Sequence, residues 1–204
     1  MRCLILDGHP DSGRLITALL DGYAAGLPDG TEIVRIAVRD LAFDPNMKHG
    51  YAIKPPLEPD LVALSQELDA CDHLVVAFPM WWGSEPAMLK GLIDRVLLPG
   101  WAFQYHRDDP MWDRLLAGRS ADVVITMDTP PWYLRLVFGN AVVKRWKRQV
   151  LGFVGFKPVR TFCFGPARSG GAEKHFASWT ATLQQAAASA ATLRRAPKLA
   201  APLT

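Results

Sequence analysis

The stretch FPMWWGSEPAMLKGLIDRVLLPGW, residues 78–101, is the most informative part of this chain. It starts at the end of an apolar run, Asp72–Phe78, and passes through Pro, two Trp and Gly into the helical spacing of Glu85–Leu98. Pro and Gly mark turns, whereas large aromatic side chains usually lie in a core. Here both are crowded into one strand-to-helix corner. Open α/β sheets bind ligands at such corners, so we expect a binding site there.

The same alternation of strand and helix runs through the whole chain. Expected strands are Arg2–Asp7, Thr31–Val38, Asp72–Phe78, Ala121–Met127 and Lys157–Gly165. Expected helices are Arg14–Leu27, Pro59–Cys71, Glu85–Leu98, a helix over Trp132–Gly155 interrupted near Gly139-Asn140, and Ala172–Arg195. Apolar runs on every strand indicate a sheet covered on both faces, which is typical of parallel strands. Right-handed crossovers then predict a doubly wound α/β sheet of five parallel strands.

The chain contains no repeat and no linker, so we expect one domain over residues 1–195 and a frayed tail over residues 196–204. The stretch Pro99–Trp112 is expected to be irregular, and its four aromatic residues would be exposed in a monomer. The formal net charge of +3 fits anionic small ligands as well as nucleic acid.

The location of the protein is predicted from what its sequence lacks. There is no signal peptide and no apolar run near the roughly 20 residues of a membrane span, so we expect a cytoplasmic protein. The three cysteines, Cys3, Cys71 and Cys163, form no CxxC pair and are expected to be reduced thiols in or near the core.

Several common site motifs are missing. The first strand ends in Asp7-Gly8-His9-Pro10 and not in GxGxxG, and neither GxxxxGK[ST] nor GxSxG occurs. The five histidines lack i, i+4 spacing, so no metal site is expected. The sequence therefore disfavours a dinucleotide-binding Rossmann site, a P-loop and a hydrolase triad.

Three loops follow strand ends, namely Gly8–Gly13, Pro79–Ser84 and Asp128–Tyr133. In a sheet of order 2-1-3-4-5 these loops lie side by side at the switch point. The first precedes a helix start, whose free N–H groups suit a phosphate. The second offers a large planar apolar surface, and the third is again aromatic. A phosphate beside a flat ring predicts a flavin nucleotide.

Four segments resemble one family. GHP (residues 8–10), FPMWW (78–82), PAMLKGLIDRVLLPGWAF (86–103) and GFVGFKPV (152–159) are similar to the flavodoxin-like NAD(P)H:quinone oxidoreductases of the DT-diaphorase and modulator-of-drug-activity type. The resemblance covers most of the chain. It implies a flavodoxin-like fold, FAD or FMN as cofactor, and NADH or NADPH as electron donor. It also implies ping-pong hydride transfer through flavin N5 to a quinone, in a homodimer with a shared active site.

The resemblance assigns roles to individual residues. The isoalloxazine would lie against Pro79, Met80, Trp81 and Trp82, and the pyrophosphate loop would contain His9. The substrate pocket would be lined by Phe103 and Tyr105 of the neighbouring subunit.

Two loops depart from the family pattern. The family often has Ser-Phe-Asn before the first helix, where this chain has Arg14-Leu15-Ile16. Ser12, Arg14 and backbone amides such as that of Leu15 are the expected replacements for its phosphate contacts. After the fourth strand, TMDTPPWY (residues 126–133) stands in place of Thr-Thr-Gly-Gly. Pro residues there donate no N–H, which leaves Asp128 and Thr129 for the cofactor and Tyr133 as the candidate catalytic Tyr.

Simpler interpretations stay open for several of these residues. Trp81 and Trp82 could be core or interface aromatics, His9 could cap the helix, and Asp128 could be a turn residue. The basic run KRWKR (residues 144–148) suggests nucleic acid, but a solvated helix face is the more common explanation. Alternative functions are a regulatory flavoprotein of a potassium-efflux-type system, an azo or nitro reductase, and a flavodoxin electron carrier. The carrier usually needs an acidic chain and a Ser/Thr-rich phosphate loop, which this sequence lacks.

Overall fold

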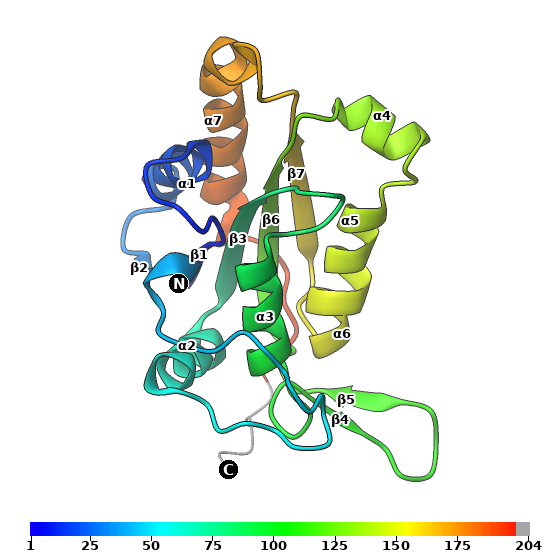
Figure 1. Ribbon diagram of the computed structural model, residues 1–204. Helices are drawn as coiled ribbons and strands as arrows, with labels where there is room; N and C mark the ends of the chain where they lie inside the picture. Colours follow the sequence, from blue (N-terminus) through cyan, green and yellow to red (C-terminus); the bar gives the residue numbers. More distant parts are fainter. Residues whose placement is uncertain (199–204) are drawn as a thin grey trace.

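The computed structural model describes residues 1–198 and has a central sheet of five parallel strands in the order β2-β1-β3-β6-β7 (Figure 1). The strands are β1 (Arg2–Asp7), β2 (Glu32–Ala37), β3 (His73–Pro79), β6 (Ser120–Thr126) and β7 (Val159–Phe164). This confirms the predicted doubly wound sheet and its order 2-1-3-4-5, with β6 and β7 as the fourth and fifth strands.

Helices cover both faces of the sheet. One face carries α1 (Leu15–Ala25) and α7 (Gly171–Ala190), and the other carries α2 (Pro59–Ala70) and α3 (Ala87–Val96). Alternation along β1 explains this division, because successive side chains of a strand point to opposite faces. Cys3 and Ile5 join the core beneath α1 and α7, whereas Leu4 and Leu6 join the larger core beneath α2 and α3.

The interrupted helix is confirmed and consists of four pieces. They are α4 (Pro131–Leu136), α5 (Ala141–Lys144), the π-helical turn η2 (Arg145–Val150) and α6 (Leu151–Val154). Asn140 breaks the helix by adopting a left-handed conformation with φ of 60°. A short 3₁₀ turn, η1 (Val38–Asp40), follows β2.

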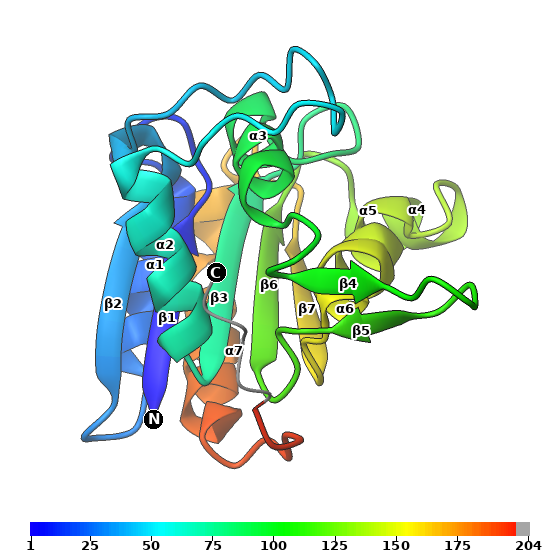
Figure 2. The same cartoon turned by 90° about the horizontal axis from the view of Figure 1, so that it is seen from below.

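The expectation of an irregular stretch over residues 99–112 is wrong in part. Two strands of three residues each, β4 (Phe103–Tyr105) and β5 (Trp112–Arg114), pair as an antiparallel hairpin that extends from the layered body (Figure 2). Phe153 of α6 anchors it, because the Trp112 ring stacks on the Phe153 ring with centroids 4.5 Å apart. The Trp112 indole N–H also donates to the Phe153 carbonyl oxygen over 2.8 Å.

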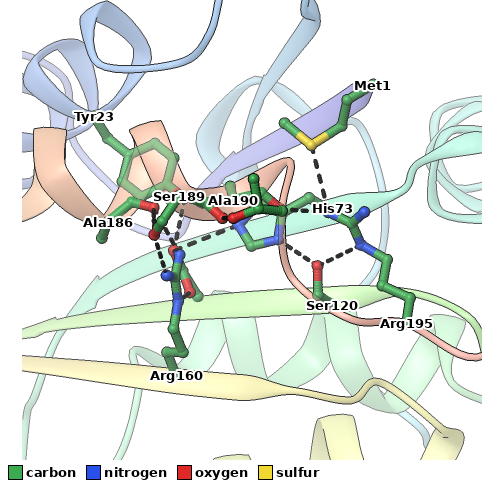
Figure 3. A network of polar contacts seen from close by, with 11 residues as sticks. Met1, Tyr23, His73, Ser120, Arg160, Ala186, Ser189, Ala190 and Arg195 are labelled. Atoms are coloured by element: carbon green, nitrogen blue, oxygen red, sulfur yellow. Dashed lines mark hydrogen bonds and ion pairs between the residues drawn. The ribbon is translucent and has the colours of Figure 1, made fainter.

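A buried polar network closes the sheet where β3 and β6 begin (Figure 3). The Tyr23 hydroxyl donates to Asp122 over 2.6 Å, and Arg160 donates to both oxygens of the same carboxylate through Nε and Nη2 at 2.7 and 2.6 Å. His73 and Ser120 hydrogen-bond over 2.8 Å, and the Ser120 hydroxyl also accepts from Arg195 at 2.8 Å. All the buried polar atoms of Asp122 therefore have partners, as burial of a charge requires.

The segment after α7 is described only as far as residue 198. Lys198 pairs with Asp72 over 2.8 Å, so the start of the predicted tail contacts the body. The rest of that tail, residues 199–204, lies outside the described residues. Among residues 1–198, no helix is long and apolar enough to cross a membrane.

Candidate functional site

The three predicted loops meet at the carboxyl edge of the sheet, because β1, β3 and β6 are neighbours. The Gly8 N–H donates to the Ala77 carbonyl over 2.8 Å, and the Met80 N–H donates to the Thr126 carbonyl over 2.7 Å. Gly8 is required here, since an added Cβ would lie 2.9 Å from the Ala77 oxygen. The first two loops also touch through side chains, with the rings of His9 and Trp81 5.8 Å apart and nearly perpendicular.

A buried carboxylate, Asp7, organises the first loop. It accepts from the His9 N–H at 3.0 Å, from the Thr17 hydroxyl at 2.8 Å and from Arg39 at 2.9 Å. His9 accepts in turn from the Asp11 N–H through Nδ1 over 3.0 Å. Burial lowers the pKa of His9, which favours the neutral ring. His9 therefore closes a turn of the loop itself, and the interpretation that it caps the helix is not supported.

The start of α1 has free donors. Its N-cap residue, Arg14, makes no side-chain capping bond, and within residues 1–198 the N–H groups of Leu15, Ile16 and Thr17 have no acceptor. Asp11, just upstream, accepts from the Ser12 N–H over 2.8 Å and from Arg14 Nε over 2.7 Å. Unpaired amides at a helix start attract anions, so this end of α1 can receive a phosphate. Of the predicted donors, the backbone N–H of Ser12 and the Arg14 side chain are already bound to Asp11.

The second loop is a tight turn that exposes two indoles. Trp81 and Ser84 exchange two backbone hydrogen bonds of 2.8 and 3.0 Å. Between them Trp82 and Gly83 both have positive φ, 51° and 80°, as in a type I′ turn. Trp82 is fully exposed and Trp81 is 48% exposed, so neither is a core residue of this chain. A bulky residue in the left-handed region is strained, and such strain clusters at ligand sites.

A buried acid that sequence reasoning missed braces this turn. The Glu85 carboxylate accepts from the Ser84 hydroxyl and from the Trp146 indole N–H, each over 3.0 Å, and from Arg145. Burial acts to raise the pKa of Glu85, but the contacts with Arg145 and Trp146 and a backbone hydrogen bond together outweigh it and hold that pKa below its usual range. Trp146 packs in the core against Phe78, so the one aromatic of the KRWKR run is not available to stack on a base. In the sequence, the one feature that points to Glu85 is its position as a single acidic residue between the turn and the helix.

The third loop is held by Asp128. Its carboxylate accepts from the Arg168 N–H at 3.1 Å and pairs with the Arg168 side chain at 2.7 Å, which ties the loops after β6 and β7 together. This contact supports a turn role for Asp128. Thr129 is half-buried beside it, and Tyr133 lies on α4 with its exposed ring edge-on to Trp132 at 5.5 Å.

Phe103 and Tyr105 lie away from these loops. Figure 1 shows the hairpin at one end of α3 and the β3–α3 loop at the other. The 10 residues of α3 span about 15 Å at 1.5 Å per residue. Phe103 and Tyr105 instead surround Phe153, with ring centroids 5.0 and 6.5 Å from it, and help line a cavity of about 430 Å³. One chain alone does not bring together all the predicted site residues.

The arrangement suits binding more than acid–base chemistry. The carboxyl edge offers free amides at one side and flat exposed rings at the other, and its carboxylates Asp7, Asp11, Glu85 and Asp128 are all engaged in hydrogen bonds or ion pairs. In the part of the chain that the structure describes, no cluster of three or more His, Cys, Asp or Glu could hold a metal ion.

Comparisons with known proteins agree with this geometry. A family model described as flavodoxin-like fold matches residues 1–189. The FMN-dependent NADH:quinone oxidoreductase of Shewanella amazonensis is 31% identical over 174 residues, which cover 79% of this chain and 83% of that protein. The NAD(P)H dehydrogenase [quinone] 1 of Rattus norvegicus is 45% identical over 49 residues. That match covers 24% of this chain and only 18% of the rat protein. The FMN-dependent NADH:quinone oxidoreductase of Cereibacter sphaeroides is matched over 46% of its own length.

Solved structures show the same fold. The NAD(P)H:quinone oxidoreductase from Methanothermobacter marburgensis superposes with a TM-score of 0.76 at 22% identity, covering 93% of this chain and 96% of that one. An FMN-dependent NADH-azoreductase from Bacillus anthracis, in complex with FMN, gives 0.71 at 16% identity, with 92% and 98% covered. At these identities the likeness is evidence for the fold alone.

Proposed function

The chain belongs to the flavodoxin-like family that includes the NAD(P)H:quinone oxidoreductases, and on this premise we propose that it is a flavin-dependent NAD(P)H:quinone oxidoreductase. One observation carries the proposal. The unpaired amides of Leu15, Ile16 and Thr17 face an anion site beside a strained turn that exposes Trp81 and Trp82. These two features fit the phosphate and the ring of a flavin mononucleotide. FMN is favoured over FAD because the relatives matched over most of their length are named FMN-dependent.

The residues of the chain would bind and orient the cofactor. The α1 amides hold the phosphate, and the turn of Trp81 and Trp82 packs on the ring, with His9 fixed at its edge by Asp11. The bound flavin supplies hydride transfer through N5, first from NADH or NADPH and then to a quinone, in a ping-pong sequence. Donor and acceptor would use one aromatic slot in turn, which is consistent with a site that has no free acid–base pair.

We also propose that two chains share each site. Tyr105 is exposed on a hairpin that lies away from the cofactor loops of its own chain. A group of apolar side chains is exposed on α4 and directly after it, namely Trp132, Leu136, Val137 and Phe138. Soluble monomers rarely expose such a surface. A two-fold partner would cover it and bring Phe103 and Tyr105 to the slot of the other chain.

A titration and a turnover assay test the cofactor and the activity. We expect FMN fluorescence to be quenched with one site per chain, and NADH to be consumed rapidly when menadione is added. Absence of FMN binding at micromolar concentration contradicts the flavin site. FMN binding without NADH consumption contradicts the proposed enzyme activity and favours a regulatory flavoprotein. Reduction of azo or nitro compounds but not of menadione would identify these compounds, and not a quinone, as the electron acceptor.

Complementation tests the shared site. One variant carries Phe103→Ala with Tyr105→Ala, and the other carries Pro79→Arg with Trp82→Ala. In a mixed dimer with sites built across the interface, one site receives both lesions and one receives neither, so about half of the wild-type activity returns. No recovery in confirmed mixed dimers, or full activity in a monomer, contradicts sharing.

A further inference from the structure

A second cavity of about 940 Å³ lies where β6 and β7 begin, and cations surround it. Its lining includes six basic side chains, which are Arg114, Lys147, Arg148, Lys157, Arg194 and Arg195. No carboxylate among residues 1–198 lines it. The six positive charges are twice the formal net charge of +3 of the whole chain. Six of the 23 Lys and Arg residues therefore line one hollow.

These cations lack negative partners in the described part of the chain. Within residues 1–198, none of the six is within 4.0 Å of a carboxylate oxygen, although most other arginines are paired. Like charges gathered in a cleft repel one another and raise the local concentration of anions. An anion bound among them would lower this repulsion.

Contacts with neighbouring residues fix the orientation of two of these arginines. Arg195 donates to the Ser120 hydroxyl at 2.8 Å and to the Ala190 carbonyl at 2.6 Å, which leaves its other guanidinium nitrogen for a ligand (Figure 3). The Arg114 guanidinium lies 5.3 Å from the centroid of the Trp112 ring. These contacts fix the direction of the remaining Arg195 nitrogen and of the Arg114 guanidinium, both of which can donate to a phosphate oxygen.

The backbone brings the other cations to the same place. Lys147 and Arg148 lie on the π-helical turn η2, a kind of irregularity that often marks functional sites. Gly118 and Gly155 let the neighbouring segments meet, because an added Cβ would lie 2.5 Å from Lys198 Cα and 2.6 Å from the Ala117 nitrogen, respectively. Three segments that are distant in sequence, residues 114–118, 147–159 and 194–197, therefore line one basic cavity.

The hollow is separate from the flavin loops. It lies at the amino ends of β6 and β7, whereas those loops lie at the carboxyl ends. The 7 residues of β6 span about 23 Å at 3.3 Å per residue. A ligand in this cavity would therefore not touch the flavin site of the same chain.

We propose that this cavity binds a small anion with several phosphate groups, either a nucleoside triphosphate or an inorganic triphosphate. Its volume lies within the range of about 300–1,000 Å³ that small-molecule sites occupy. Several convergent Arg and Lys donors match the several negative oxygens of a phosphate chain. The buried side chains of Phe156 and Val159 give the cavity an apolar floor against which a base could lie.

Isothermal calorimetry on the FMN-loaded protein at low salt tests the site, with inorganic triphosphate and ATP as probes. The test variant is Lys147→Gln with Lys157→Gln, and both residues are exposed, so folding should be unaffected. The control is Lys144→Gln, which belongs to the same basic run but lines a different hollow. If each cation contributes about tenfold to affinity, the double variant binds about 100-fold more weakly, and the control binds as wild type does.

The two probes distinguish the sources of the ligand. Equal affinities for inorganic triphosphate and ATP would mean that the site recognises the phosphate chain alone. Tighter binding of ATP would mean that the protein also contacts the nucleoside. No binding of either probe at millimolar concentration overturns the proposal, as does equal binding by wild type and the double variant. Binding only to single-stranded oligonucleotides too long for the cavity also overturns it, in favour of a nucleic-acid surface. None of these results depends on quinone turnover, and the assay can be repeated on flavin-free protein if FMN does not bind.

Discussion

Replacing Trp82 by Asn separates two effects of opposite sign. In the folded chain the indole of Trp82 is fully exposed, so its removal loses no buried surface. Its φ of 51° costs an ordinary L-residue about 1–2 kcal/mol. Asn tolerates this conformation, and Asn followed by Gly83 is the preferred pair for a type I′ turn. We expect Trp82→Asn to raise the free energy of unfolding by about 1 kcal/mol and Tm by about 2–4 °C.

The same substitution should weaken cofactor binding. Stacking of an aromatic side chain on a nucleotide base contributes about 1–3 kcal/mol, and we take this as the scale for an indole on a flavin ring. FMN affinity should therefore fall by about 5- to 150-fold. Urea unfolding of the flavin-free protein measures the first effect, and quenching of FMN fluorescence measures the second.

Trp146→Ala is the matched control for loss of an indole. Trp146 is 1% exposed, packs on Phe78 and donates to Glu85, so its removal should destabilise the fold by about 3–5 kcal/mol. If Trp82→Asn also lowers the free energy of unfolding by 1 kcal/mol or more, the side chain is buried in the protein in solution and the strain argument is wrong. Unchanged FMN affinity would refute the stacking role.

Three further outcomes are expected. Burial acts to raise the pKa of Asp122, but bonds from His73 and Arg160 outweigh it and hold that pKa below the ordinary value. The ionised Asp122 therefore stabilises the fold above about pH 4, and this stabilisation is lost as the pH falls through the folded-state pKa. Urea unfolding between pH 7 and pH 3 should show a steeper fall in the free energy of unfolding for wild type than for Asp122→Asn. Asp7→Asn leaves Arg39 without its carboxylate and should lower both stability, by about 1–3 kcal/mol, and FMN affinity, whereas Asp21→Asn on the exposed face of α1 should change neither. Burial raises the pKa of the thiols to about 12 for Cys3 and Cys71 and about 11 for Cys163, so a thiol reagent at pH 7.5 should modify them only as the chain unfolds, and fast modification of the native protein contradicts their burial.

The sheet and the place of the site could be predicted because both follow from local patterns. Continuous apolar runs such as that of β1 indicated a sheet buried on both faces, and Pro59 marked a helix start. Once the strand order was inferred, the loops after β1, β3 and β6 had to be neighbours. These steps need only strand ends and crossover handedness, and both can be read from one sequence.

Contacts between distant residues could not be predicted in this way. Glu85 meets Arg145 across 60 positions, and the hairpin strands are too short to show a period and depend on Phe153 for support. The left-handed conformation of Trp82 is also invisible, since Trp has no preference for it and the turn of Trp81 and Ser84 imposes it. Tertiary packing decides these features, and local sequence preference does not.

The Asp11 contacts mean that the first loop contains its own counter-ion. Its carboxylate occupies the Ser12 N–H and Arg14, which would otherwise wait unpaired for a ligand. The loop therefore keeps its shape when empty, and a phosphate at the α1 amides would meet the negative charge of Asp11 just upstream of them. Under the proposed function, Asp11→Ala should bind FMN more tightly than wild type and with a steeper dependence on salt. The balance between cofactor exchange and cofactor affinity would then depend on a single carboxylate.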